Sequence, residues 1–336
     1  MLFPASSIPF LGLLVISTVF VISSSSWFGA WIGLELNMMS FIPLISLKMN
    51  QFFSESALKY FLIQALGSSL LIFASCLLFS FPLLSSPLLL STLLLKLGSA
   101  PFHFWFPQIM EGLAWPQTIL LMSIQKIAPM FLISSLMIYP TLIQMTIFSS
   151  ILSALVGAFG GLNSLYLRKI MAFSSINHMS WMLISISISD NFWIIYFLFY
   201  TFISSSIVLM FNMFQAFSFS DLLKSEYMKF SFMIFFSTSL LSLGGLPPFT
   251  GFVPKWMLIQ LLINHKLILP LMFLLLSALI TLYFYLRILI PFILFMNPIL
   301  NSYMKTSNSF YSSFTINLLT FFNFIGLMTP FLFLLF

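Results

Sequence analysis

The stretch LSLGGLPPFTGFVPKW (residues 241–256) lies inside an apolar run that is too long to be one membrane helix. The run extends over residues 230–263, and its 34 residues in a single helix would measure about 51 Å. The hydrocarbon core of a bilayer is only about 30 Å thick. We therefore expect one membrane span whose helix is broken, with Gly245, Pro248 and Pro254 in the break and Lys255 beside it.

The composition places the whole chain in a bilayer. Hydrophobic residues make up 61% of it, charged residues only 5%, and the mean hydropathy is +1.13. A soluble domain carries about 25% charged residues, so this chain has too few to cover a water-facing surface. Apolar runs longer than about 17 residues, without period-two alternation, indicate helices rather than a β-barrel. We predict an all-α polytopic membrane protein in which a single cysteine, Cys76, excludes an internal disulfide.

The distribution of basic residues predicts the topology. We predict eleven spans, at about 5–22, 26–47, 57–80, 84–106, 115–138, 141–162, 167–189, 191–217, 230–263, 267–295 and 311–335. The loops after even-numbered spans, with their edges, carry Lys48, Lys59, Arg168, Lys169, Lys224, Lys229 and Lys305. Lys266 is the exception. The positive-inside rule then places the N-terminus and the even loops on the matrix or cytoplasmic side, and the C-terminus on the opposite side.

A short internal repeat links the fourth and ninth spans. Gly98-x-x-Pro101-Phe102-x4-Pro107, in LLLKLGSAPFHFWFPQ (residues 93–108), has the same pattern as Gly245-x-x-Pro248-Phe249-x4-Pro254. Spans five apart have opposite orientations, so the pattern predicts inverted repeats, each with a discontinuous helix, over residues 1–138 and 139–295. Residues 296–336 would then form a separate C-terminal helix. A chance match between common membrane residues is the alternative.

Four ionisable residues lie near the centres of predicted spans: Glu35, Lys96, Lys126 and Lys255. A Lys or Asp at a helix centre costs about 2.5–3.5 kcal/mol on insertion scales, so these residues point to a function. A proline removes the hydrogen bond to the carbonyl four residues back, and each lysine has one nearby: Pro101, Pro129 and Pro254. We expect three helix defects, each with a lysine facing a hydrated interior.

Several residues have a second interpretation at this point. Lys255 could instead extend to an interface, and Glu35 could be only a structural counter-ion. His178, in SSINHMSW, is either a proton-transfer group or a packing histidine, and packing is favoured for His103. Glu111 is expected to be a solvated loop residue.

The motifs of several functional classes are absent from the sequence. It has no P-loop, and Gly157, Gly160 and Gly161 do not form a dinucleotide fingerprint. One cysteine and three histidines without metal-ligand spacing exclude an iron–sulfur or zinc site. The scattered positive charges leave no nucleic-acid footprint. We therefore expect no cofactor in this chain.

The sequence resembles the antiporter-like membrane-arm subunits of mitochondrial NADH:ubiquinone oxidoreductase, respiratory complex I, in their shortened animal form. The motifs that carry the resemblance extend over about residues 23–290: SSSSWFGAWIGLELNMMSFIPLI, ESALKYF, LLLKLGSAPFHFWFPQIMEGL, QKIAPM, GAFGGLNSLYLRKIMAFSSINHMSWML and LSLGGLPPFTGFVPKW. The first span and the last forty residues match only in character.

The resemblance implies a multi-pass subunit of the mitochondrial inner membrane, without a redox centre, in the proton-translocating enzyme of the respiratory chain. NADH, FMN, iron–sulfur clusters and ubiquinone would belong to other subunits, and the partners would be neighbouring membrane-arm subunits and lipids. In that family a glutamate pairs with a lysine on a broken helix, and an axis of lysines and histidines carries protons. The matching positions are Glu35, Lys96, Lys126, Lys255 and His178.

One position departs from the family. Many relatives carry an acid where this chain has Gln108, which puts a proton route through that acid in doubt and leaves Glu111 as a substitute.

Two other functions stay open from sequence alone: a stand-alone cation/proton antiporter, and a structural spacer in which the buried lysines would be expendable.

Overall fold

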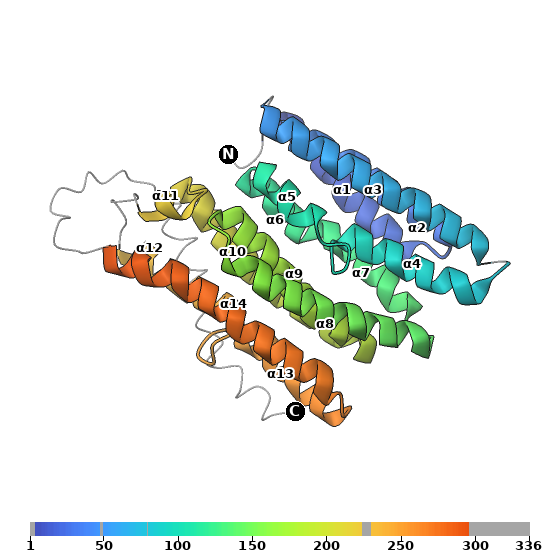
Figure 1. Ribbon diagram of the computed structural model, residues 1–336. Helices are drawn as coiled ribbons and strands as arrows, with labels where there is room; N and C mark the ends of the chain where they lie inside the picture. Colours follow the sequence, from blue (N-terminus) through green and yellow to red (C-terminus); the bar gives the residue numbers. More distant parts are fainter. Residues whose placement is uncertain (1–3, 48–49, 79, 224–229, 296–336) are drawn as a thin grey trace.

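The computed structural model describes residues 4–47, 50–78, 80–223 and 230–295. Its helices lie side by side as one elongated bundle (Figure 1). A 3₁₀ turn at Ala5–Ser7 leads into α1 (Ile8–Ser23), α2 (Trp27–Ile45), α3 (Gln51–Leu77), α4 (Pro82–Leu97), α5 (Trp105–Gly112), α6 (Trp115–Met122), α7 (Ile124–Leu136), α8 (Pro140–Leu162), α9 (Leu167–Ile188), α10 (Asp190–Phe214), α11 (Phe219–Leu223), α12 (Phe230–Gly244), α13 (Phe252–Asn264) and α14 (Ile268–Phe295). The predicted all-α, polytopic membrane fold is confirmed.

Ten of the predicted spans correspond to these helices. Among the residues that the structure describes, seven helical segments are long and apolar enough to cross a membrane, and one of them joins α6 and α7. The fourth, fifth and ninth predicted spans are each divided in two: α4 and α5, α6 and α7, α12 and α13. The short helix α11 was not predicted. The eleventh predicted span lies outside the described residues. So do four of the lysines used to predict the topology: Lys48, Lys224, Lys229 and Lys305.

Helix α9 is the centre of the bundle. It packs against α5, α7, α8, α10, α13 and α14, and most of its side chains are buried. Its buried face includes polar residues such as Ser174, Asn177 and His178. A helix with this composition is stable in a membrane because other helices, rather than lipid, surround its polar side chains.

Glycines end the first halves of the two broken spans that the repeat predicted. Gly98 follows α4 with φ +71°, and Gly245 follows α12 with φ +78°. The amides of Gly98 and Ser99 donate to the carbonyls of Leu95 and Leu94, at 3.1 and 3.2 Å. Gly245 and Leu246 bond in the same way to Ser242 and Leu241, at 2.9 and 3.4 Å. Both are Schellman caps, which need a residue in the left-handed region and so favour glycine.

The expectation that prolines create the helix defects was therefore wrong in its mechanism. Pro101 lies in the connection beyond Gly98, and Pro254 lies in the first turn of α13, where a proline is tolerated. Pro129 lies inside the continuous helix α7. The break nearest Lys126 is instead at Ser123, whose φ and ψ of −111° and −84° are not helical. The inverted relation between residues 1–138 and 139–295 stays a prediction.

Two cavities mark the two ends of the bundle. We call the larger, of about 1230 Å³, the mouth cavity; it is lined by Pro4 and by residues at the loops after the second, fourth, sixth and eighth spans, including Lys59, Glu111, Arg168 and Gln215. A cavity of about 350 Å³ is lined by residues at the loops after the first, fifth and seventh spans, including Ser24, Ser135 and Asp190. Even-numbered and odd-numbered loops thus line different cavities, as expected if they lie on opposite sides of the membrane in the way the charge pattern predicted.

Candidate functional site

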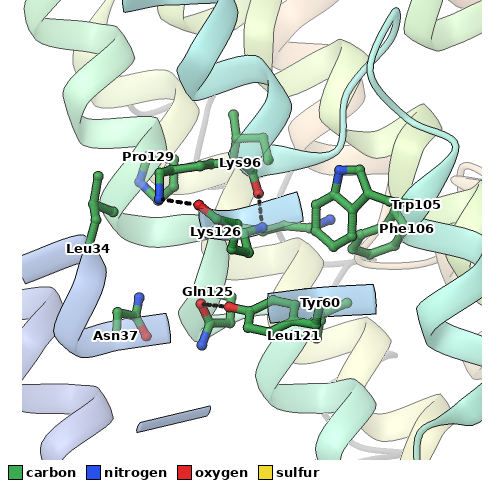
Figure 2. A pocket seen from close by; sticks show the side chains of 12 residues that line it. Leu34, Asn37, Tyr60, Lys96, Trp105, Phe106, Leu121, Gln125, Lys126 and Pro129 are labelled. Atoms are coloured by element: carbon green, nitrogen blue, oxygen red, sulfur yellow. Dashed lines mark hydrogen bonds between the residues drawn. The ribbon is translucent and has the colours of Figure 1, made fainter. Parts of the chain in front are cut away.

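Lys96 of α4 and Lys126 of α7 line the same small cavity, which we call the lysine cavity (Figure 2). Its volume is about 20 Å³, which is enough for one water molecule. Only 6% of Lys96 and 2% of Lys126 are exposed. The remaining lining residues are Leu34, Asn37, Tyr60, Gln64, Leu97, Trp105, Phe106, Leu121, Gln125 and Pro129. The fold therefore brings together two lysines that are thirty positions apart in the sequence.

The broken end of α4 is stabilised by polar groups from its neighbours. The side-chain amide of Gln64 on α3 donates to the Lys96 carbonyl at 3.2 Å, and Nζ of Lys96 donates to the Gln64 carbonyl at 3.4 Å. The indole of Trp105, just beyond the break, donates to the Leu95 carbonyl at 3.0 Å. The bond from Gln64 satisfies the Lys96 carbonyl, which the end of α4 would otherwise leave free.

Lys126 is held differently. Its Nζ atom is buried and has no hydrogen-bond partner in the protein. It lies over two aromatic rings, 5.0 Å from the centroid of Phe106 and 5.3 Å from that of Tyr200. A cation–π contact stabilises an ammonium group without fixing its three protons in direction. Lys126 therefore lines the lysine cavity with an ammonium group that no protein hydrogen bond orients.

Glu35 lies on α2 at the edge of this site and is half-buried. Its neighbours in sequence, Leu34 and Asn37, line the lysine cavity together with Lys96. Glu35 takes part in neither ion pair that the described residues contain, which are Glu55–Lys59 and Glu111–Lys169. Leu36 and Met39 beside it are exposed, so Glu35 is at the boundary between the lysine cavity and an open face of α2.

His178 continues the line of ionisable groups beyond Lys126. The Tyr200 ring that contacts Lys126 has its centroid 5.0 Å from that of His178. Nδ1 of His178 is 2.9 Å from the hydroxyl of Tyr196. A small cavity of about 10 Å³ adjoins His178 and both tyrosines and reaches Pro254, the residue before Lys255. His178 is thus placed between Lys126 and Lys255.

Lys255 lies in the first turn of α13, next to the break of the ninth span. Its Nζ donates to the carbonyl of Gly244, the last residue of α12, at 2.9 Å, and only 5% of the residue is exposed. The interpretation of Lys255 as a lysine that extends to an interface is therefore wrong. Its ammonium instead interacts favourably with the carbonyl end of a half-helix.

The contacts above link the five predicted residues only through shared neighbours, in the order Glu35, Lys96, Lys126, His178 and Lys255. His103 and Glu111 are not among them. His103 is half-buried in the α4–α5 connection, with Nδ1 3.2 Å from the Pro101 carbonyl. Glu111 forms its ion pair with Lys169, at 2.6 Å, beside the mouth cavity. Within the described residues, no group of His, Cys, Asp and Glu could hold a metal ion.

Sequence reasoning missed the uncharged members of this site. Tyr60, Tyr196, Tyr200 and Gln125 are polar residues on apolar helices that separate or connect the charged ones. Tyrosine in a membrane helix is usually found at the lipid–water interface, so these tyrosines carry no signal of burial by themselves. A weak signal existed for Tyr60, because Ser56 and Gln64 lie four residues before and after it on the same helix face.

The chain's sequence matches characterised proteins over most of its length. Residues 24–86 and 81–281 match the family described as NADH:quinone oxidoreductase/Mrp antiporter, transmembrane. The chain is 47% identical over 327 residues to NADH-ubiquinone oxidoreductase chain 2 of Anopheles gambiae, which covers 95% of this chain and 94% of that protein. The protein of the same name from Aedes aegypti is 46% identical, covering 94% and 93%. The chain belongs to the NADH:quinone oxidoreductase/Mrp antiporter family.

The fold of this antiporter family member is also found in a solved assembly. A chain of respiratory complex I from Thermus thermophilus, determined with bound aureothin, superposes with a TM-score of 0.85. The alignment covers 97% of this chain and 79% of the other, at 20% sequence identity. This likeness shows the same fold, and the sequence matches confirm the family that the motifs pointed to.

Proposed function

We propose that this chain is a proton-translocating, antiporter-like subunit in the membrane arm of respiratory complex I. The names of its relatives support this assignment, and so do the buried groups Lys96, Lys126, His178 and Lys255 with half-buried Glu35 beside them. The chain would work in the mitochondrial inner membrane with its N-terminus and mouth cavity on the matrix side and its C-terminus on the intermembrane-space side. NADH oxidation and ubiquinone reduction, with FMN and iron–sulfur clusters, would take place in other subunits.

The observation that carries the proposal is that each lysine of the line lies beside a break in a membrane helix. A nearby carboxylate stabilises the protonated form of a buried lysine, and burial without a partner favours the neutral form. While Glu35 is close, Lys96 holds its proton. When Glu35 is withdrawn or neutralised by a neighbouring subunit, Lys96 releases its proton toward Lys126 and Lys255. The position of Glu35 at an open face of α2 suits this coupling.

Substitutions of Glu35 and Lys96 test this mechanism. Lys96→Ala and Glu35→Gln should each depress NADH-driven proton pumping by the reconstituted complex, because either change removes one member of the charge pair. Pumping is measured as acidification of the vesicle lumen per NADH oxidised. Lys266→Gln, in the exposed loop after α13, is the matched control and should pump normally. Normal pumping by both Lys96→Ala and Glu35→Gln would remove these residues from the mechanism.

A stand-alone cation/proton antiporter is the second candidate, because the family description also includes antiporters. The two functions differ in their assemblies. On a native gel after mild solubilisation, a complex I subunit migrates with a very large NADH-oxidising assembly, whereas a lone band with ion-exchange activity would favour the antiporter.

A further inference from the structure

The lysine cavity and the mouth cavity come within about one helical turn of each other on three helices. In each case one residue lines the lysine cavity and another, at most four positions away on the same helix, lines the mouth cavity. Four residues of α-helix rise about 6 Å. The pairs are Tyr60 and Ser56 on α3, Phe106 and Gln108 on α5, and Leu121 and Gln117 on α6. The wall between the cavities is therefore thin.

Of the three wall residues that line the lysine cavity, Tyr60 is the one with a hydroxyl group. Only 2% of it is exposed, and its ring lies between Phe41 and Trp105, with centroids 5.1 and 6.3 Å away. Its hydroxyl donates to Oε1 of Gln125 at 3.1 Å, on the inner side of the wall (Figure 2). Ser56, one turn along α3, is buried and lines the mouth cavity.

The inner side of the wall has unmet hydrogen-bonding capacity. Nζ of Lys126, Nε2 of Gln125 and Oδ1 of Asn37 are buried atoms without a protein partner, and all three residues line the lysine cavity. Buried polar groups of this kind are normally satisfied by ordered water. The cavity has the volume for one water and offers it both donors and an acceptor.

We propose that Tyr60 is the proton-transfer residue through which protons from the mouth cavity reach Lys126. This inference rests on the proposed function. The Tyr60 hydroxyl turns from Gln125 to the water in the lysine cavity and gives that water its proton, while a hydronium ion on the mouth side gives a proton to a lone pair of the Tyr60 oxygen. That water then protonates neutral Lys126. Tyr60 ends neutral, one O–H bond having formed and one broken, and the net movement is one proton.

Gln125 is the positioning residue for this transfer. Because its Oε1 accepts the hydrogen bond from the Tyr60 hydroxyl, Gln125 holds that hydroxyl beside the lysine cavity, which both residues line. After each transfer, the hydroxyl rotates back to this orientation.

The mouth cavity suits proton uptake. The Glu111–Lys169 ion pair, Arg168 and Lys59 lie at or beside it, and it is wide enough for many waters. These charged groups favour water on the mouth side of the wall, next to Ser56 and Gln117.

The test uses the intact complex in sealed vesicles. Tyr60→Phe removes the hydroxyl and keeps the ring that packs against Phe41 and Trp105. We expect fewer protons pumped per NADH oxidised and a larger ratio of pumping rates in H₂O and D₂O, because proton supply becomes limiting. Gln125→Leu should enlarge the isotope ratio with a smaller loss of pumping. Tyr283→Phe, on an exposed part of α14, is the control and should match the unmodified complex.

The outcomes separate this inference from the proposed function. Lys126→Met is measured in parallel. If Lys126→Met loses pumping while assembled Tyr60→Phe and Gln125→Leu both keep the normal proton ratio and isotope ratio, the route through Tyr60 is wrong and the proposed function stands. If Lys126→Met also pumps normally, the proposed function is wrong as well. Loss of pumping in Tyr60→Phe, with normal assembly on a native gel, supports the inference.

Discussion

Lys126→Met should abolish proton translocation through this chain and leave its fold as stable as before. The ammonium of Lys126 has no hydrogen-bond partner in the protein, so its removal leaves no protein group without one. Methionine has a similar length and stays over the Phe106 and Tyr200 rings, where sulfur–aromatic contacts are favourable. Burying a charge without a partner is costly, so replacing it by an apolar group of similar volume removes that cost.

Two measurements check this prediction. Proton pumping per NADH is followed in reconstituted vesicles, and the melting temperature of the purified complex is followed by light scattering. Lys255→Met is the informative comparison, because Nζ of Lys255 donates to the Gly244 carbonyl. Its loss leaves a buried carbonyl unpaired, at a cost of about 1–3 kcal/mol, so Lys255→Met should lower both pumping and stability. A Lys126→Met complex that pumps normally contradicts the role of Lys126.

The charged residues of the site could be predicted from sequence because each is conspicuous alone. Lysine at the centre of an apolar span is energetically costly, so Lys96, Lys126 and Lys255 can be recognised as unusual from the sequence alone. Their convergence could not be predicted in that way. Lys96 and Lys126 share a cavity because α4 packs against α7, and this packing depends on side-chain shapes along both helices.

The helix breaks were predicted in the right places for two spans and the wrong place for the third. Gly98 and Gly245 each precede a proline by three residues, and both glycine and proline interrupt helices. The position of each break could therefore be predicted from the sequence, although the break was attributed to the proline instead of the glycine. Ser123 has no glycine or proline beside it, between Met122 and Ile124. Its non-helical backbone follows from how α6 and α7 pack, so no local signal marks it.

Gly251→Ala should disrupt the second broken helix and prevent normal assembly of the complex. A Cβ atom at Gly251 would overlap the carbonyl oxygen of Ser242 on α12, closer than any non-bonded contact allows. Because that atom belongs to the backbone, the end of α12 and the start of α13 would have to separate. Overpacking of a closely fitted core costs about 1–3 kcal/mol and occasionally more. The shift would also move Lys255 from the Gly244 carbonyl, so pumping should fall together with stability.

The measurement is the amount of assembled complex on a native gel, with its melting temperature. Gly12→Ala is the matched control, because a Cβ at Gly12 in α1 meets no atom within 4 Å. Alanine inside a helix is more stable than glycine by roughly 0.5–1 kcal/mol, so the control should assemble normally and melt no lower than the unmodified complex. If both variants assembled to the same extent and melted at the same temperature, α12 and α13 would not approach each other closely at Gly251. The proposed hydrogen bond from Lys255 to the end of α12 would then be in doubt.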